Sequence, residues 1–263
     1  MSDSKQRGVR INVNGPGLLT IVVFAAVWEL IIRLGVVQYE YLPAPSAIVG
    51  GLFKLISSGQ LAVDAAHTLQ AVVLGWAIAV LIGVTLGLLM GISSTFRSYS
   101  LATVEVLRPM PGIAFVPVAL LLFGFSLQTE LVVIVLPAVW PALINTMGGV
   151  ASVHRRLFDV GATFRLSRVR FVTKILLPAA LPSILVGMRL SLTLALVLAI
   201  VVEMVGNPSG LGYAVVRDQQ ALRPELMFAN VITIGILGIV LNAVLVQLAL
   251  LVVPAASAQL RAY

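Results

Sequence analysis

The sequence places charged side chains inside long apolar stretches, where a charge is costly unless it has a partner or lines an aqueous path. Glu29 and Arg33 are four residues apart, so on a helix they can form a self-contained ion pair. Glu105 and Arg108 are three residues apart and stand directly before Pro109, where a helix should break or kink. Broken backbone at membrane depth is tolerated where it is buried in protein or lines a cavity. We predict a structural role for the first pair and take Glu105 and Arg108 as candidate pathway residues.

Arg189 and Glu203 are two further candidate pathway residues, and they fall in one apolar segment. Their separation corresponds to about 40° less than four helical turns, so the two side chains share a face. An axial distance of about 21 Å prevents direct pairing. The two residues therefore mark two depths of one stripe. That stripe either lines a translocation path or packs inside the helix bundle. The charges do not distinguish these alternatives, because intramembrane charges face bundle interiors in both cases.

The sequence contains few of the side chains that catalysis or metal binding requires. The chain has no cysteine, which excludes disulfides, thiolate metal sites and nucleophilic thiols. Its two histidines, His67 and His154, stand apart from any recognisable ligand motif. No apolar segment combines a histidine, a carboxylate and a serine as an integral-membrane hydrolase or lipid-modifying transferase would require. We predict that the chain is not an enzyme and holds no metal and no cofactor of its own.

The elements that carry these residues are predicted membrane helices. Of the 263 residues, 60% are hydrophobic and only 10% are charged, against roughly 25% charged in soluble domains. A spanning helix needs about 20 apolar residues. Apolar stretches bounded by charge, proline or glycine give six predicted spans: 17–36, 64–92, 99–123, 130–150, 179–205 and 226–253. We expect one all-α polytopic membrane domain over residues 1–263, in which Gly83, Gly87 and Gly91 permit close helix packing.

The lysines and arginines between the predicted spans indicate how the chain is oriented. Eleven fall on one side of the membrane: Lys5, Arg7, Arg10, Arg97, Arg155, Arg156, Arg165, Arg168, Arg170, Lys174 and Arg261. Three fall on the other: Lys54, Arg217 and Arg223. Because cytoplasmic loops are enriched in these residues, both termini are predicted to be cytoplasmic. The same bias explains the net charge of +7 without a nucleic-acid partner.

Two segments are predicted on the outer side. Segment 37–62 contains an apolar pattern typical of a short interfacial helix, which Pro45 would begin. Segment 206–225 opens with a run of turn residues: Asn207, Pro208, Ser209, Gly210 and Gly212.

The cytoplasmic loop 151–178 carries the most specific pattern. Four of its apolar residues are spaced i, i+3, i+4 and i+7 and would form one helical stripe: Leu157, Val160, Gly161 and Phe164. A second short helix is predicted to begin with Ser167 as its N-cap. A charged hairpin with an apolar ridge is suited to docking a partner. The alternative is that the ridge packs on the protein's own cytoplasmic surface.

The order of residues in this loop resembles a family motif. Asp159 is followed by Val160 and Gly161, and Ile175, Leu177 and Pro178 follow at positions +16, +18 and +19. This spacing is similar to the EAA motif, E-A-A-x3-G-x9-I-x-L-P, of inner-membrane permease subunits of binding-protein-dependent ABC importers. Further stretches resemble the nitrate, sulfonate and taurine branch of that family: LPAPSAI at 42–48, GLLMGIS at 87–93, LRPMPGIAFVP at 107–117, LFG at 122–124, LLPAALP at 176–182 and GLGY at 210–213.

Two positions depart from the motif. Asp159 stands where the family usually has a glutamate, and Arg165 stands where it has a glycine. A glycine there would allow a left-handed turn between the two short helices, which an arginine adopts only at a cost.

The resemblance implies a six-span permease subunit in a bacterial-type cytoplasmic membrane. It implies a second permease copy, two ATPase subunits inside, and an extracytoplasmic binding protein that delivers a small polar or anionic organic solute. The helix in loop 151–178 would be the coupling helix. Its ATPase contacts would come from six residues: Leu157, Asp159, Val160, Gly161, Phe164 and Arg165.

ATP and Mg²⁺ would be bound by the ATPase partner, because this chain has no G-x-x-x-x-G-K-[ST] loop to cradle phosphates. A secondary transporter is the nearest alternative, since charged spans and proline breaks also suit that class. It would not need the EAA-like spacing. An integral-membrane enzyme is the more distant alternative.

Overall fold

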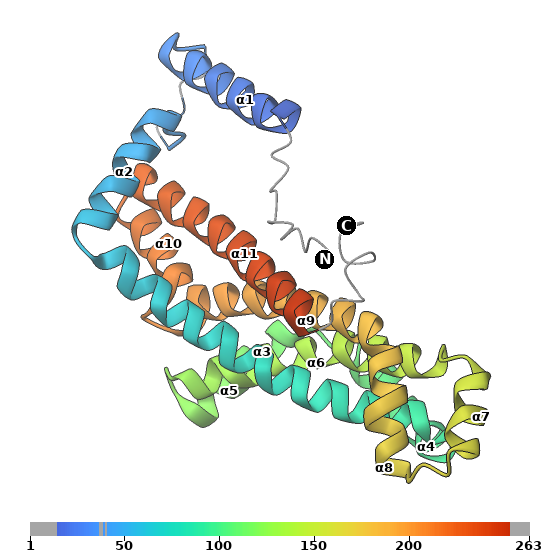
Figure 1. The fold of residues 1–263 in the computed structure, drawn as a ribbon. Helices are drawn as coiled ribbons and strands as arrows, with labels where there is room; N and C mark the ends of the chain where they lie inside the picture. Colours follow the sequence, from blue (N-terminus) through green and yellow to red (C-terminus); the bar gives the residue numbers. More distant parts are fainter. Residues whose placement is uncertain (1–14, 37–38, 40, 253–263) are drawn as a thin grey trace.

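The computed structural model describes residues 15–36, 39 and 41–252. The terminal residues 1–14 and 253–263, for which a cytoplasmic position is predicted, lie outside this part. In the described residues the chain is helical throughout and has no strand (Figure 1). The elements are α1 (Gly15–Arg33), α2 (Pro45–Ser57), α3 (Gln60–Ile92), α4 (Ser94–Leu107), η1 (Gly112–Phe115), α5 (Val116–Phe123), α6 (Leu127–Ala151), α7 (Arg155–Thr163), α8 (Arg168–Phe171), η2 (Val172–Leu176), α9 (Leu177–Gly206), α10 (Gly210–Gln220) and α11 (Pro224–Val252).

Three long helices, α3, α6 and α9, form the centre of the bundle, with α6 packed against both of the others. Small residues permit the close approach. A Cβ added to Gly83 of α3 would lie 2.7 Å from the Cβ of Ala142 and 2.7 Å from the carbonyl oxygen of Val139. Gly87 and Gly91 meet α6 in the same way, one and two turns further on. The predicted packing role of these glycines is therefore confirmed.

The third predicted span is broken. α4 and the η1–α5 segment are inclined at 80° to each other, across a break that contains Pro109 and Pro111. The missing N–H groups and fixed φ angles of the prolines account for the break. Within the described residues, five helices are long and apolar enough to cross a membrane, or six if the bent pair forms one span. The predicted all-α membrane fold is confirmed.

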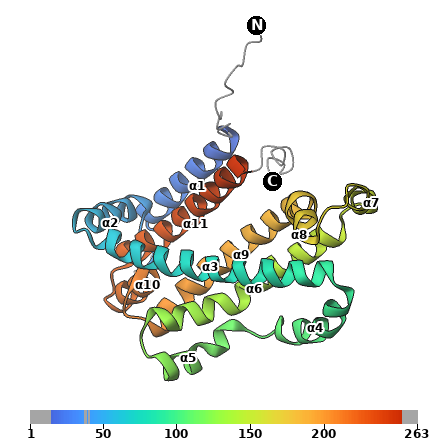
Figure 2. The same cartoon turned by 60° about the horizontal axis from the view of Figure 1, so that its bottom comes forward.

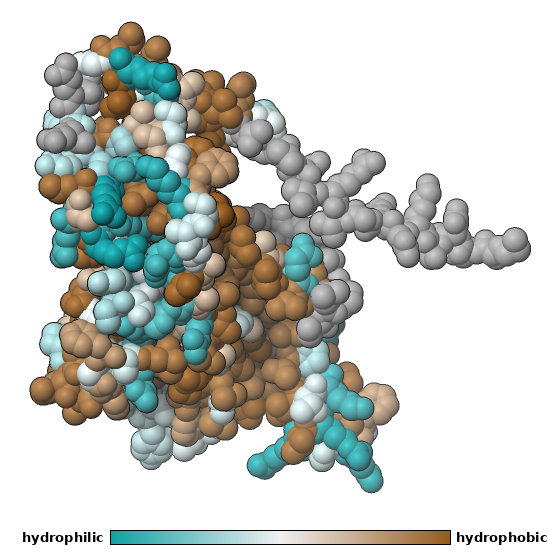
Figure 3. Space-filling view, turned by 90° about the vertical axis from the view of Figure 1, so that its left-hand side faces the viewer, coloured by the Kyte–Doolittle hydropathy of each residue, from teal (hydrophilic) through white to brown (hydrophobic). Residues whose placement is uncertain are grey.

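The bundle has two chemically different ends, which we name by their elements. The hairpin end carries α4, α7 and α8, and the α10 end carries α2, α10 and the beginning of α3 (Figure 2). Viewed from the side of α2, hydrophilic side chains gather over the α10 end, and much of the remaining surface is hydrophobic (Figure 3). Within segment 206–225, the turn residues Asn207, Pro208 and Ser209 precede α10, and this helix buries Leu211, Ala214 and Val215.

The N-terminal helices attach at the α10 end. The predicted ion pair between Glu29 and Arg33 is present. Glu29 also accepts hydrogen bonds from the backbone N–H and the hydroxyl of Ser46, which joins α1 to the start of α2. The ring of Trp28 meets Phe228 of α11 at a centroid distance of 6.2 Å. Pro45 begins α2, as predicted, and the Glu29–Arg33 pair has a structural role.

Candidate functional site

Local capping shapes the hairpin formed by α7 and α8. His154 is the N-cap of α7, and its Nδ1 accepts a hydrogen bond from the N–H of Arg156 at 3.2 Å. Ser167 is the N-cap of α8, where its hydroxyl accepts from the N–H of Arg170 at 3.4 Å. The predicted cap is therefore confirmed. From α8 the chain continues through the π-helical η2 into α9, which connects the hairpin directly to a central helix.

The turn between α7 and α8 is left-handed at Arg165, whose φ is +48°. Two hydrogen bonds close the end of α7. The N–H of Leu166 donates to the carbonyl of Gly161, and the N–H of Arg165 donates to the carbonyl of Ala162, each at 3.0 Å. This 6→1 and 5→2 pair is a Schellman motif, which usually has glycine at the left-handed position. The chain thus makes the turn with an arginine, at the conformational cost expected from sequence.

The apolar stripe of α7 is divided between two environments. Gly161 is buried, because the ring of Phe171 lies where its Cβ would be, and Leu157 is half-buried. Val160 is 42% exposed and Phe164 is 73% exposed. The stripe therefore does not form one open ridge as expected, because α8 folds back onto part of it. Asp159 and Arg165 are exposed.

The four candidate pathway residues lie in different environments. Glu105 and Arg108 are exposed near the end of α4, and no ion pair joins them in the described part of the chain. Arg189 is half-buried and lines a hollow between α9 and α11, together with Thr193 and Asn242. Glu203 is 1% exposed and faces α3 and α10. Arg189 and Glu203 therefore meet different neighbours, although helical spacing predicted one shared face.

Glu203 belongs to a buried polar cluster, which we define as His67, Thr68, Glu130, Glu203 and Asn207. Glu130 and Thr68 are fully buried, Asn207 is 8% exposed, and the His67 side chain is 27% exposed. Nε2 of His67 lies 2.9 Å from Oε1 of Glu130, which also accepts a hydrogen bond from the amide of Asn207. The cluster brings together the start of α3, the start of α6 and the end of α9.

The helix α10 closes over Glu203. The carboxylate oxygen Oε2 accepts from the N–H of Gly212 at 2.8 Å and from the hydroxyl of Thr68 at 3.0 Å. The same hydroxyl accepts from the N–H of Leu211 at 2.9 Å. Gly210, with φ of +93°, lies so close to the carboxylate that a Cβ would collide with it. The GLGY stretch noted in the sequence is therefore the cover of a buried carboxylate.

A second polar set adjoins the cluster and contains Asp64, Arg217, Asp218 and Asn230. Arg217 lies 3.6 Å from Asp64 and 3.4 Å from Asp218, and Asn230 donates to Asp218 at 2.9 Å. These contacts connect α3, α10 and α11. Asp64, His67 and Arg217 line one small hollow, which gives the two sets a common opening.

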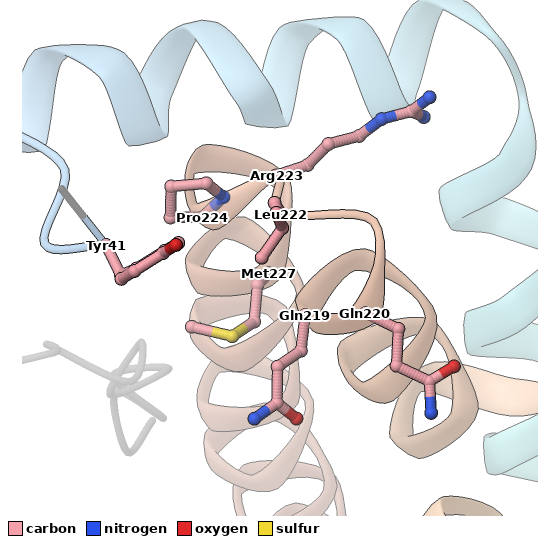
Figure 4. Close-up of a pocket in the computed structure, with 7 residues that line it drawn as sticks. All are labelled: Tyr41, Gln219, Gln220, Leu222, Arg223, Pro224 and Met227. Atoms are coloured by element: carbon pink, nitrogen blue, oxygen red, sulfur yellow. The ribbon is translucent and has the colours of Figure 1, made fainter.

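Another hollow at the α10 end lies at the turn between α10 and α11 (Figure 4). Tyr41, Gln219 and Met227 are among its lining residues, and Arg223 extends away from the other labelled side chains. Leu222 in this turn has a φ of +56° and is 65% exposed. The hollow is open at the surface and contains none of the predicted site residues.

Most of the polar cluster cannot be recognised in the sequence. There His67 stands apart from any ligand motif, Glu130 lies at the boundary of a predicted span, and Asn207 is one of a run of turn residues. Their partners are 63 to 140 residues away in the chain, so no local spacing connects them. The available signal was that a histidine and two glutamates all fell near the outer ends of predicted spans. The expectation of no metal site follows from the absence of cysteine and the presence of only two histidines in the sequence.

Together, the fold and these two regions define a polytopic helical membrane protein with a buried polar cluster at one end and a basic hairpin at the other. Residues 79–257 match the family described as binding-protein-dependent transport system inner membrane component. The chain belongs to this family.

Three relatives share most of their length with this chain. An aliphatic sulfonates transport permease protein of Bacillus subtilis is 35% identical over 84% of this chain and 80% of its own length. The nitrate import permease protein of Leptolyngbya laminosa is 29% identical over 72% of this chain and 68% of its own. The taurine transport system permease protein of Escherichia coli is 27% identical over 85% of this chain and 83% of its own.

The fold is similar to that in a solved structure of the MetNI methionine ABC transporter. The TM-score is 0.56 at 16% sequence identity, over 69% of this chain and 94% of that one. The solved structure supports the fold. The family match and the relatives show that the chain is a transport permease subunit of an ABC importer and not an enzyme. It is an inner-membrane component that works with a separate ATPase and a binding protein. Family membership decides against the secondary transporter and the membrane enzyme.

Proposed function

We propose that the α7–α8 hairpin is the element that docks on the ATPase. The observation that carries this proposal is an exposed apolar surface on a basic hairpin. Phe158, Val160 and Phe164 are between 42% and 73% exposed. Asp159 and Arg165 add exposed charge beside them, whereas Leu157 and Gly161 pack within the protomer and hold the hairpin in shape. Apolar anchors surrounded by charges that can pair are typical of protein interfaces.

The orientation follows from the charge of the two ends. The hairpin contains Arg155, Arg156, Arg165, Arg168 and Arg170, and the α10 end carries few lysines and arginines. The positive-inside rule puts the hairpin end in the cytoplasm, with both termini, and the α10 end outside. There the α10 end is available to the binding protein. ATP and Mg²⁺ are held by the ATPase, and this chain transmits the motion through η2 into α9.

Two copies of this chain enclose one path. The support is the exposure of α4. No residue of this helix is buried within the protomer, and large side chains such as Val106 and Tyr99 are 68% and 82% exposed. Glu105 and Arg108 lie on the same helix, and a second copy would bring them into a protein environment. Such an environment is where charged residues at membrane depth are tolerated.

The solute is a small organic anion. The named solutes of the three relatives, aliphatic sulfonates, nitrate and taurine, share an oxyanion group. Arg189 is the residue of this chain that suits such a group. It is half-buried in the middle part of α9, lines the hollow toward α11, and makes no ion pair within the described residues. A guanidinium is well matched to the geometry of an oxyanion.

Docking is tested by copurification of the tagged ATPase with the permease. We expect Phe164→Glu to abolish the complex, because the change buries an unpaired charge in the interface. The control is Phe125→Glu, since Phe125 is equally exposed, at 72% against 73%, but lies beyond α5, before α6 begins. An intact complex with Phe164→Glu would reject the hairpin as the docking element. Loss of the complex with both variants would reject the specific role of Phe164.

The solute is tested with the reconstituted complex in vesicles. Uptake of aliphatic sulfonates, nitrate and taurine should be compared with uptake of a neutral amino acid and a cation. We expect an anion to be transported, and Arg189→Ala to abolish its transport while the complex still assembles. Arg189→Lys should retain part of the activity. Unchanged anion transport by Arg189→Ala would remove this residue from the path.

A further inference from the structure

The polar cluster leaves two carboxylate oxygens without partners in a buried place. Oε2 of Glu130 and Oε1 of Glu203 make no hydrogen bond, and the two side chains are 0% and 1% exposed. The other oxygen of each carboxylate is satisfied, by His67 and Asn207 in one case and by Thr68 and Gly212 in the other. Buried carboxylate oxygens normally have a partner, because their desolvation is otherwise uncompensated.

The two polar contacts of His67 Nε2 require opposite hydrogen-bonding roles of this nitrogen. Its Nε2 lies 2.9 Å from Oε1 of Glu130, a contact that requires the nitrogen to donate. The same Nε2 lies 3.2 Å from the amide nitrogen of Asn207, a contact that requires it to accept. One ring nitrogen cannot do both at once. A cation between Nε2 and the carboxylates would remove the conflict, and Asn207 could then turn its amide oxygen toward the ion.

The cationic side chains near the cluster are too few to balance its carboxylates. The cluster and the adjoining set contain four carboxylates, on Asp64, Glu130, Glu203 and Asp218. Arg217 is their guanidinium, and it is already shared by Asp64 and Asp218. Counted with all four carboxylates ionised, the formal negative charge exceeds that of Arg217 and a protonated His67 together, and such an excess is costly in a buried place.

We propose that His67, Glu130 and Glu203 bind one divalent transition-metal cation, for which Zn²⁺ is the representative ion. One imidazole nitrogen and two carboxylate oxygens are ligands that such ions accept. The three donor atoms lie within 4.8 Å of one another. Ligands at about 2.1 Å from one tetrahedral ion are about 3.4 Å apart, so the most widely spaced donors would approach each other by up to about 1.4 Å on binding, through side-chain rotation. His67, which is 27% exposed and lines an open hollow, provides the entry.

The ion would act as a clamp. His67 belongs to α3, Glu130 to α6 and Glu203 to α9, so the metal would join the three central helices at the α10 end. Each ligand comes from a different helix, and the site is therefore complete only when these helix ends are together. The metal would stabilise that arrangement over any state in which the ends separate.

The proposal is tested by metal binding to the purified permease–ATPase complex, prepared without a polyhistidine tag and stripped with EDTA. Zinc content after equilibration with Zn²⁺ and removal of the excess is measured by elemental mass spectrometry, and affinity by titration. We expect one Zn²⁺ for each permease chain. Glu130→Gln, Glu203→Gln and His67→Ala should each weaken binding by at least about 100-fold, because loss of a direct ligand costs at least as much as the 10–100-fold measured for the outer partners of ligands.

Two controls keep the result interpretable. His154→Ala removes the other histidine of the chain, at the hairpin end, and should leave binding unchanged. The thermal midpoint of each stripped variant shows whether it is folded. Zn²⁺ should raise this midpoint for the wild-type chain and for His154→Ala, but not for the three cluster variants. Failure of the wild-type chain to retain zinc would overturn the proposal. So would retention that is unaffected by the cluster variants, which would mark the binding as adventitious. Both readouts are independent of transport.

Discussion

The hydroxyl oxygen of Thr68 lies 3.0 Å from a carboxylate oxygen of Glu203, 135 residues later in the chain. The same hydroxyl receives the N–H of Leu211 at the start of α10. One small side chain of α3 therefore joins the end of α9 to the helix that covers it. This contact holds α10 in place over the end of α9, and the first of three predictions concerns it.

Thr68→Val should destabilise the protein. The valine has the shape of threonine but leaves the N–H of Leu211 without its partner and removes one donor from Glu203. Both groups are buried, and an unsatisfied buried group costs about 1–3 kcal/mol. The measurement is the thermal midpoint in detergent. Thr85→Val is the matched control, because Thr85 is exposed on the same helix and donates only to its own Leu81 carbonyl. Equal midpoints for the two variants would contradict the prediction.

Gly83→Ala should also lower the thermal midpoint, through the packing of α3 on α6. The added Cβ would lie 2.7 Å from the backbone oxygen of Val139, so the two helices must separate. Overpacking of this kind costs about 1–3 kcal/mol. The control is Gly148→Ala, in a helical glycine of α6 that has open space around it. That change should be neutral or stabilise by about 0.5–1 kcal/mol. A tolerated Gly83→Ala would show that α3 and α6 are less closely fixed.

Arg165→Gly should stabilise the hairpin. A residue with a side chain pays roughly 1–2 kcal/mol for a left-handed conformation, part of which the flexibility of glycine in the unfolded chain returns. We expect a net gain of about 1 kcal/mol. Amide hydrogen exchange of α7 and α8 measures it, as slower exchange in the variant.

Arg165→Ala separates conformation from charge in the same experiment. Alanine removes the guanidinium but keeps the Cβ, so it should give no gain. If both variants slowed exchange equally, repulsion among the arginines of the hairpin would be the cause instead of the left-handed backbone.

Local chemistry explains which features the sequence predicted. The break in the third span follows from prolines, and the start of α8 follows from the capping ability of Ser167. Each depends on interactions within a few residues, which are the same in any fold that contains the segment. The division of the α7 stripe was not predicted, because it depends on how α8 folds back to bring Phe171 over Gly161.

By itself the sequence determined that the chain is a bundle of apolar helices, where most of them begin and end, and which loop forms a basic hairpin. These properties are set by hydrophobicity and by caps and breaks that act over one or two helical turns. Only the tertiary structure decided that His67, Glu130 and Glu203 share one buried cluster, that Arg189 faces α11, and that α10 covers Glu203. Those relationships depend on how each helix is rotated against neighbours far away in the chain. That rotation is fixed by the packing of all the helices together, which no single segment encodes.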